Sequence, residues 1–294
     1  MKRILIASDL SERSQRALQR AVSLAKQFGS ELSVLHVVDD DQPHALIGGE
    51  SRATEAALRD HLDRSGGSDL ATVPIISVVA GDPFRAIADE ANRLEADLIV
   101  MGSHRKRLLG DIFTGTTIER VMRLGGRPVL MVNREDDAPY SNVLAAVDLS
   151  EAAAHALQAA QGLGLLDPDR DAAVHGFVPL GEGMMYYAGV ERERVDEHVA
   201  VSASQARTAI TRFLRDNGFG KLSNLLLIEK GTPFEAIGAG IHQLQPDLLV
   251  IGTRGYGGLK RVLLGSVADE VLRQVECDIL AVPPDTAGDP AGAS

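Results

Sequence analysis

The 294-residue sequence contains no tryptophan, a single cysteine and few aromatic residues, which make up 4% of the chain. So few aromatic side chains leave little surface on which nucleic-acid bases or sugar rings could stack. The one cysteine, Cys277, cannot form a disulfide within the chain or a metal site made of cysteines alone, so we expect a reducing compartment, the cytoplasm. No run of about eighteen uncharged apolar residues occurs, so the sequence predicts no membrane-spanning helix.

The chain also lacks an excess of positive charge. Its 30 Lys and Arg residues face 41 Asp and Glu residues, giving a net charge of −11, which disfavours nucleic acid or an anionic membrane as the main partner. Residues 1–138 carry 18 basic and 21 acidic side chains, whereas residues 139–294 carry 12 and 20. We therefore expect the two halves to present different surfaces.

The two halves repeat one another in sequence. The segment ILIASDLSE at 4–12 returns as VLAAVDLSE at 143–151, GDPF at 81–84 returns as GTPF at 231–234, and ADLIVMG at 96–102 returns as PDLLVIG at 246–252. The two occurrences of the second and third segments lie farther apart in the sequence than the two occurrences of the first segment. This difference places an insertion in the second copy around 179–194. Glycines flank the run MMYY at 184–187 and predict a loop or lid, although the same apolar patch could cover a helix or make a subunit contact.

Each copy alternates short apolar runs with longer stretches of helical period, a pattern typical of a parallel sheet with helices around it. The sequence predicts strands at 3–7, 32–38, 74–80, 98–102 and 129–132 in the first copy, and at 142–147, 172–178, 224–230, 248–252 and 279–282 in the second. Ser11 is a suitable N-cap for a helix over 13–29, and Pro83 and Pro233 suit the first turn of a helix.

This organisation predicts two α/β domains of similar size. We place the first at 1–138 and the second at 139–284, joined by a linker at 134–139. The remaining segment, 285–294, is small and polar, and we expect it to be disordered.

A glycine-rich pattern follows the fourth predicted strand of the second copy. Gly252 is followed by Gly255, and ten residues later Gly265-Ser266 opens a helix predicted over 267–274. Glycines let the backbone approach phosphate oxygens closely, and a helix N-terminus adds unpaired N–H groups beside the Ser266 hydroxyl. Because ligands of open parallel sheets bind at the carboxyl ends of strands, the pattern predicts an anion site there. The alternative is a turn whose glycines serve only tight packing of strand against helix.

The pattern resembles that of the universal stress protein family, whose nucleotide-binding members carry Gly-x2-Gly-x9-Gly-Ser/Thr after the fourth strand. The resemblance covers both copies and extends to an Asp after the first strand, a His late in the second and a Gly-x-Pro after the third; these are Asp9 and Asp148, His36 and His175, and 81–83 and 231–233. It implies two tandem Rossmann-like (adenine nucleotide alpha hydrolase-like) domains, each a five-stranded parallel sheet with helices on both faces.

The resemblance also implies a function and a site. The protein would bind ATP or a related adenine nucleotide, with or without Mg²⁺, and would have a regulatory role in the stress response. In the second copy the carried-over residues are Asp148 at the adenosine end, Gly176 beside adenine, and Gly252, Arg254, Gly255, Gly265, Ser266 and Val267 around the phosphates. Association through the fifth strands is implied as well, so the copies would form a pseudo-dimer within the chain and pair again between chains as a homodimer.

The first copy departs from the pattern at one position. Arg105 stands where the second glycine belongs, and its side chain would obstruct the closest backbone approach to a phosphate, although its charge could pair with an anion. A second nucleotide site and a loop that only packs both remain open here. Such a site would comprise Asp9, Val37, Gly102, Arg105, Gly115 and Thr116.

Two other functions remain open at this level. One is an enzyme that slowly hydrolyses ATP or transfers a phosphoryl or adenylyl group, with Asp148 helping to hold a metal; no general base or arginine finger is identifiable, so we assign no catalytic residue and no metal site. The other is an interaction scaffold without nucleotide. We expect His36 and His175 to be hydrogen-bonded strand residues rather than metal ligands or bases, and Cys277 to be a packed, inert thiol.

Overall fold

The computed structural model describes residues 1–38, 44–103, 117–253 and 264–284. In these residues the first copy contains β1 (Arg3–Ala7), α1 (Glu12–Phe28), β2 (Glu31–Val38), α2 (His44–Arg64), η1 (Gly67–Asp69), β3 (Ile75–Ala80), α3 (Pro83–Arg93), β4 (Leu98–Gly102), α4 (Thr117–Gly125) and β5 (Val129–Val132). The second contains β6 (Val143–Ala146), α5 (Glu151–Gly162), β7 (Ala172–Phe177), α6 (Glu182–Tyr187), α7 (Arg192–Asp216), η2 (Gly220–Leu225), β8 (Leu226–Lys230), α8 (Pro233–Leu244), β9 (Leu248–Gly252), α9 (Ser266–Gln274) and β10 (Asp278–Val282). The predicted strands are all present, and none of their ends differs from the prediction by more than two residues.

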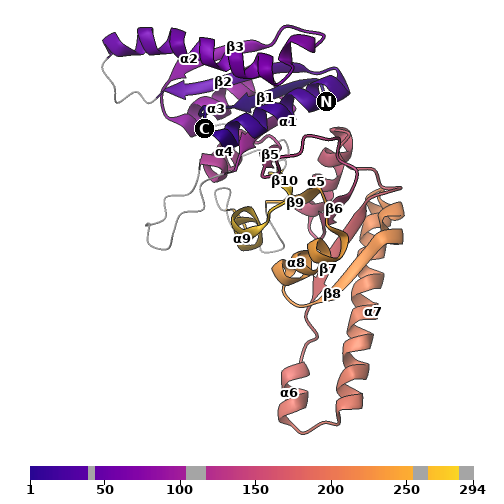
Figure 1. Ribbon diagram of the computed structural model, residues 1–294. Coiled ribbons are helices and arrows are strands. Elements are labelled where there is room, and N and C mark those ends of the chain that lie inside the picture. Colours follow the sequence, from indigo (N-terminus) through magenta and orange to yellow (C-terminus); the bar gives the residue numbers. More distant parts are fainter. Residues whose placement is uncertain (39–43, 104–116, 254–263, 285–294) are drawn as a thin grey trace, which may run out of the picture.

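The ten strands form one sheet in the order β3-β2-β1-β4-β5-β10-β9-β6-β7-β8 (Figure 1). Within each copy the neighbouring strands are parallel, which confirms the predicted five-stranded parallel sheets. Between the copies β5 and β10 pair antiparallel, with Leu130 opposite Leu280. The fifth strands therefore join the two copies into a pseudo-dimer within the chain, as the family resemblance implied.

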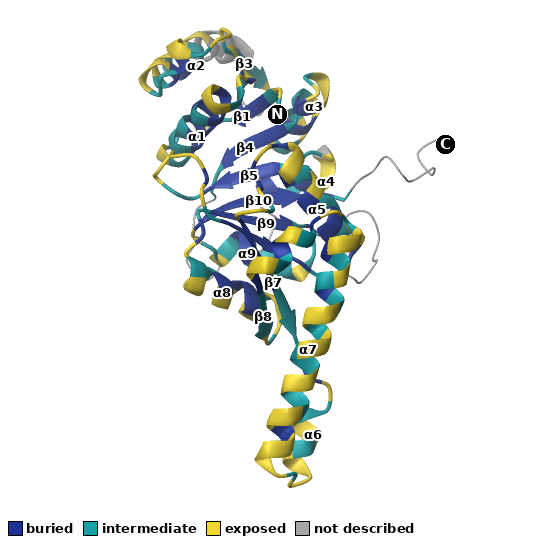
Figure 2. Cartoon of the chain, turned by 90° about the vertical axis from the view of Figure 1, so that its right-hand side faces the viewer, coloured by how far each residue is buried: buried dark blue, intermediate teal, exposed yellow. Residues whose placement is uncertain are grey.

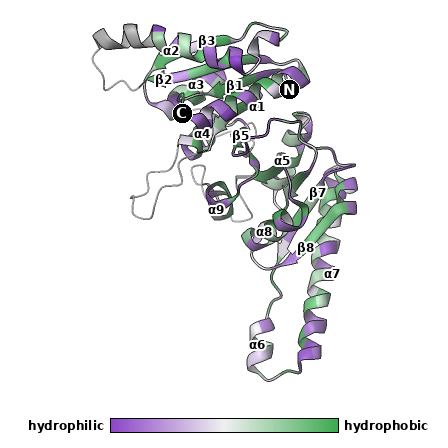
Figure 3. Cartoon of the chain, in the orientation of Figure 1, coloured by the Kyte–Doolittle hydropathy of each residue, from purple (hydrophilic) through white to green (hydrophobic). Residues whose placement is uncertain are grey.

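The sheet separates two hydrophobic cores because successive side chains of each strand point to opposite faces. On one face the strands pack against α1, α2, α5 and α7, and on the other against α3, α4, α8 and α9. Ile4 and Ile6 belong to the first core and Leu5, between them, to the second. The inner strands are accordingly buried and largely hydrophobic, whereas the outer strands β3 and β8 are mostly half-buried (Figures 2 and 3). Each core continues across the β5–β10 junction, so the copies are stabilised together rather than separately.

The helix ends agree with their sequence signals. The Ser11 side chain accepts a hydrogen bond from the Ser14 N–H and caps α1, which ends at Gly29 with a φ of 65°. Pro83 and Pro233 occupy the first turns of α3 and α8, as predicted. Residues 224–225, predicted as the start of a strand, instead end the η2 turn, so β8 is shorter than expected.

The predicted loop at 179–194 is wrong, because most of this segment forms α6 and the start of α7; a role as a lid stays a prediction. Gly181 and Gly189, with φ values of 81° and 70°, bracket α6 instead of breaking the structure. The N-terminal half of α7 and α6 project together from the sheet (Figures 1 and 2). We call residues 178–201 the arm; it carries six of the eleven large hydrophobic residues exposed in the described structure, including Tyr187, which is 97% exposed.

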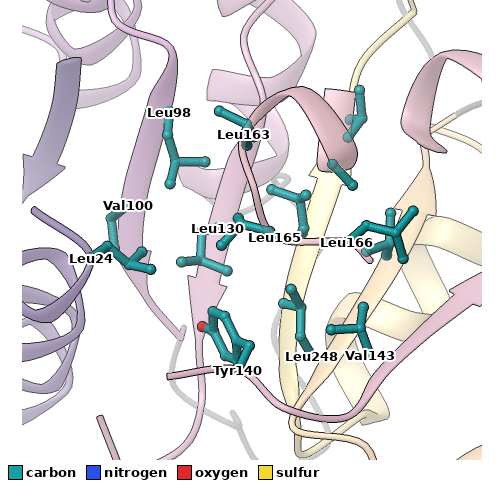
Figure 4. Packing of buried hydrophobic residues seen from close by; sticks show 14 of the residues in the cluster. Leu24, Leu98, Val100, Leu130, Tyr140, Val143, Leu163, Leu165, Leu166 and Leu248 are labelled. Atoms are coloured by element: carbon teal, nitrogen blue, oxygen red, sulfur yellow. The ribbon is translucent and has the colours of Figure 1, made fainter. Parts of the chain in front are cut away.

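A buried polar cluster lies where the copies meet. Arg20 of α1 and Asp278 of β10 form an ion pair, with Arg20 Nε 3.4 Å from Asp278 Oδ2. Tyr140 donates its hydroxyl to the same carboxylate at 2.6 Å, and the Arg20 guanidinium lies 4.3 Å from the centre of the Tyr140 ring. Tyr140 also belongs to the first core, where leucine and valine side chains of both copies pack together (Figure 4). The cluster thus links the first copy, the connecting segment and the last strand.

Among the described residues, no helix combines the length and apolar character needed to cross a membrane. The predicted disordered tail, 285–294, lies outside the described residues.

Candidate functional site

The candidate site of the second copy lies between β6 and β9, where the order of the strands in the sheet reverses. From β6 the chain passes through α5 on one face, whereas from β9 it passes to α9 on the other face, although β6 and β9 are neighbours. Such a switch point leaves a crevice at the carboxyl ends of the two strands. Asp148 follows β6 and Gly252 ends β9, so the structure brings these two predicted residues to the same edge.

Asp148 organises the turn between β6 and α5. Its Oδ1 accepts hydrogen bonds from the N–H of Ser150, at 2.9 Å, and from the Ser150 hydroxyl. Ser150 in turn accepts a hydrogen bond from the Ala153 N–H at 3.1 Å and caps α5. The aspartate therefore has a local structural role in addition to any contact with a ligand.

Gly252 and Gly176 are glycines because other backbone lies against them. A Cβ built on Gly252 would lie 2.9 Å from the carbonyl oxygen of Ala152 in α5. One built on Gly176 would lie 3.0 Å from both the Ala236 Cβ and the Thr232 oxygen at the start of α8. Because these residues have no side chains, the helices can pack closely on the strand ends. This agrees with the alternative that glycines at these two positions serve only tight packing of strand against helix.

Gly265, Ser266 and Val267 form the beginning of α9. The Gly265 N–H donates to the carbonyl oxygen of Thr253 at 2.9 Å, which holds the helix start against the end of β9. The other helices at this edge, α5 and α8, are capped by Ser150 and Thr232, whereas no side chain of the described residues caps α9. Its first N–H groups and positive dipole end therefore suit an anion. Arg254 and Gly255 lie outside the described residues.

The first copy repeats much of this geometry. Asp9 Oδ1 accepts from the Ser11 N–H at 3.0 Å and from the Ser11 hydroxyl at 2.5 Å. Burial raises the pKa of Asp9, but the two hydrogen bonds from Ser11, one from Ser14 and the charge of Arg13 together outweigh it, so the pKa lies below its ordinary value. A Cβ on Gly102 would lie 2.6 Å from the carbonyl oxygen of Arg13 in α1. Val37, at the place of Gly176, has a partly buried side chain near the second core. Arg105, Gly115 and Thr116 lie outside the described residues.

The two strand histidines have the same partner in both copies. His36 Nδ1 lies 2.7 Å from the carbonyl oxygen of Ser8, and His175 Nδ1 lies 2.8 Å from that of Val147. Each ring thus bonds the turn after the first strand of its copy, which confirms the expected hydrogen-bonded role. In the described part of the chain, no group of three or more His, Cys, Asp or Glu residues is arranged to hold a metal ion.

An ion pair connects the helices that follow the two glycine-rich loops. Arg273 of α9 lies 3.6 Å from the Glu119 carboxylate of α4 and 2.9 Å from that of Asp269. Glu119 is buried although it is charged, so this pair fixes α4 relative to α9 across the junction of the copies. Sequence analysis missed it, since the two residues are far apart in the chain and neither belongs to a motif.

Comparison with known proteins identifies the family. A model of the universal stress protein family matches the chain twice, over residues 1–133 and 139–283. The chain belongs to the universal stress protein family. Both copies are therefore family domains in tandem.

Relatives of this tandem universal stress protein share its full length. Universal stress protein E of Escherichia coli K12 is 25% identical over 312 residues, covering 96% of this chain and 94% of that protein. Among solved structures, the functionally unknown protein PA1789 from Pseudomonas aeruginosa PAO1 has a TM-score of 0.65 and 21% identity, covering 97% of this chain and 93% of that one. A universal stress protein from Archaeoglobus fulgidus has a TM-score of 0.64 and 19% identity, covering 96% and 98%. At these identities the structural matches show the fold alone.

Proposed function

We propose that this protein binds ATP or a related adenine nucleotide in its second copy and that binding regulates its part in the stress response. The observation that carries the proposal is the start of α9, which no side chain in the described part of the chain caps and which the Gly265–Thr253 hydrogen bond holds against β9. It stands at the switch point beside Asp148 and falls within the complete pattern of Gly252, Gly255, Gly265 and Ser266. Family membership and the pattern support the same ligand.

Different residues of the site would contact different parts of the nucleotide. Asp148, after β6, would face the ribose, and backbone groups of Gly176, at the end of β7, would contact the adenine ring. The backbone N–H groups of Ser266 and Val267, together with Arg254 and Gly255, would bind the phosphates, while Gly265, whose N–H bonds Thr253, would hold the helix start in place. Mg²⁺ would bind together with the triphosphate, because the described residues form no group of metal ligands that could hold the ion without it.

We propose that the first copy, residues 1–138, is a second family domain that binds nucleotide weakly or not at all. Asp9 and Gly102 are placed like Asp148 and Gly252, so the difference between the copies rests on Arg105 in place of a glycine. The second domain would then extend over 139–284. Nucleotide binding in one domain would affect the conformation of the other through the shared cores and the Glu119–Arg273 ion pair.

Titration calorimetry with ATP and Mg²⁺ tests the site. We expect about one nucleotide per wild-type chain, and loss of binding in Gly255→Arg, because a side chain there blocks the backbone approach to phosphate. Gly258→Arg is the matched control, since it adds the same charge to the same loop outside the pattern and should keep binding. Unchanged affinity in Gly255→Arg would sink the assignment.

A second candidate function is an interaction scaffold without nucleotide. It is favoured by the packing reasons found for Gly102, Gly176 and Gly252, whose missing side chains are explained without a ligand. The scaffold predicts that ATP leaves the melting temperature unchanged, whereas a nucleotide-binding protein is stabilised by its ligand.

We further propose that the protein works in the cytoplasm as a homo-oligomer. The fifth strands are already paired within the chain, so they are not available for contact between chains. An oligomer must therefore use a different surface from the one that joins the two copies.

A further inference from the structure

The outer strand of the first copy, β3, carries no charged residue, and no strand of the described structure pairs with its outer edge. β3 reads IISVVA and pairs, among the described residues, with β2 alone. Beside its start, Val73 is 91% exposed and Ile75 is 54% exposed. An edge strand presents unpaired N–H and C=O groups, and natural proteins usually protect such an edge with charged residues, proline or a covering segment. Within β3 itself there is no charge and no proline.

The other outer strand, β8, is protected in this way. It contains Glu229 and Lys230, and Lys230 forms an ion pair with Glu182 at the start of α6. Charged side chains and the neighbouring arm disfavour the addition of another strand at this edge. The two ends of the ten-stranded sheet are therefore not equivalent, although the copies share one fold.

A second copy of the chain is the partner that β3 suits best. The sheet already continues from one copy to the other through an antiparallel pair of apolar segments, Val129–Met131 of β5 against Ile279–Ala281 of β10. β3 has the same apolar character. A twofold axis perpendicular to the sheet would place it antiparallel to itself, with equivalent faces on the same side and no like charges brought together.

The side-chain pattern of β3 selects a register for this pairing. Ile76 and Val78 pack toward the first core and Val79 toward the second, so residues with the same parity share a face. With the axis at Ser77, Ile75 would lie opposite Val79 and Ile76 opposite Val78. These are pairs of β-branched residues, which stabilise neighbouring strands, and the exposed Ile75 would become covered.

We propose that β3 pairs antiparallel with β3 of a second copy about a twofold axis at Ser77, extending the sheet through both chains. This assigns a surface to the homo-oligomer proposed above and is independent of nucleotide binding. Because each chain has one such edge and β8 is protected, assembly stops at a closed dimer.

Sedimentation velocity of the full chain without nucleotide tests the dimer. We expect a species of about twice the 31.3 kDa chain, and at least a tenfold weaker association in Ile75→Lys. Leu225→Lys is the matched control, since Leu225 is 49% exposed just before β8, and it should leave association unchanged. Both changes affect exposed side chains, and equal melting curves by circular dichroism would show that folding is kept. A monomeric wild-type protein, or equal association in the two variants, would overturn the proposal.

Disulfide trapping tests the register. Ser77→Cys should give a covalent dimer on mild oxidation, because the axis brings the two Ser77 positions together, whereas Leu225→Cys should not. The native Cys277 does not compete, since it is buried and its pKa is raised to about 12 by burial. Absence of the Ser77→Cys dimer under conditions where the protein is dimeric would refute the pairing.

Discussion

The buried pair of Arg20 and Asp278 makes a strong prediction about how the two copies hold together. Replacing Arg20 by methionine keeps most of the aliphatic stem but removes the guanidinium. That group donates to the carbonyl oxygen of Ala138 at 2.5 Å and to that of Asp136, both in the connecting segment, and it lies beside the fully buried Asp278. The substitution therefore removes contacts to the connecting segment and to the last strand at once.

The expected loss follows from what the substitution leaves behind. Asp278 would still accept hydrogen bonds from Tyr140 at 2.6 Å and from the N–H groups of Asn133 and Arg134, each at 2.9 Å, but its charge would be buried without a cation. Removing one partner of a buried ion pair costs about 3–5 kcal/mol. We expect a loss of this size in the free energy of unfolding of Arg20→Met.

Urea unfolding followed by circular dichroism measures the effect, because the chain has no tryptophan to report by fluorescence. Arg16→Met is the matched control: Arg16 lies one turn earlier on α1 and also reaches the connecting segment, with its guanidinium 2.8 Å from the exposed Glu135 carboxylate. An exposed pair contributes at most about 1 kcal/mol. The double variant Arg20→Met with Asp278→Asn should lose less than the sum of the single losses. A loss in Arg20→Met no larger than in Arg16→Met would refute the reasoning.

Three further predictions concern single side chains. Asp9→Asn should lower the free energy of unfolding at pH 7, because the lowered pKa of Asp9 means that its charged form stabilises the fold above the unfolded pKa of about 3.9. The difference in free energy between variant and wild type should vanish as the pH falls through the folded pKa. A difference that persists at low pH would contradict this. Cys277, whose burial raises its pKa to about 12, should react with iodoacetamide at pH 8 about a thousandfold slower in the folded than in the urea-unfolded protein, as measured by mass spectrometry, and equal rates would show an accessible thiol. Tyr187→Ser, at the exposed end of α6, should change the free energy of unfolding by less than about 0.5 kcal/mol, and a larger loss in a urea titration would mean that the arm packs against something.

The repeat made most of the fold predictable from the sequence. Aligned apolar runs marked the strands, and Ser11, Pro83 and Pro233 marked helix starts that the structure contains. The positions of Asp148 and Gly252 at one sheet edge also followed, because parallel strands bring their carboxyl ends together. What these residues bind is not fixed by their placement.

Other features could not be read from local sequence. The sequence suggested that Gly181 and Gly189 belong to a loop. Instead they lie in the turns directly before and after α6, a short helix that packs on α7. Arg20 interrupts the apolar stripe of Ala17, Ala21 and Leu24, which was a signal of a buried charge, yet nothing near it indicated its partner. Asp278 lies near the other end of the chain, and only the pairing of β5 with β10 brings the two together.

The most direct test of nucleotide binding by the second copy is to denature freshly purified protein and identify any released small molecule by mass spectrometry, with its molar ratio to the chain. The account predicts about one adenine nucleotide per chain, present in wild type and absent in Gly255→Arg. No released nucleotide, together with no rise in melting temperature on adding ATP and Mg²⁺, would contradict it and leave the scaffold as the function.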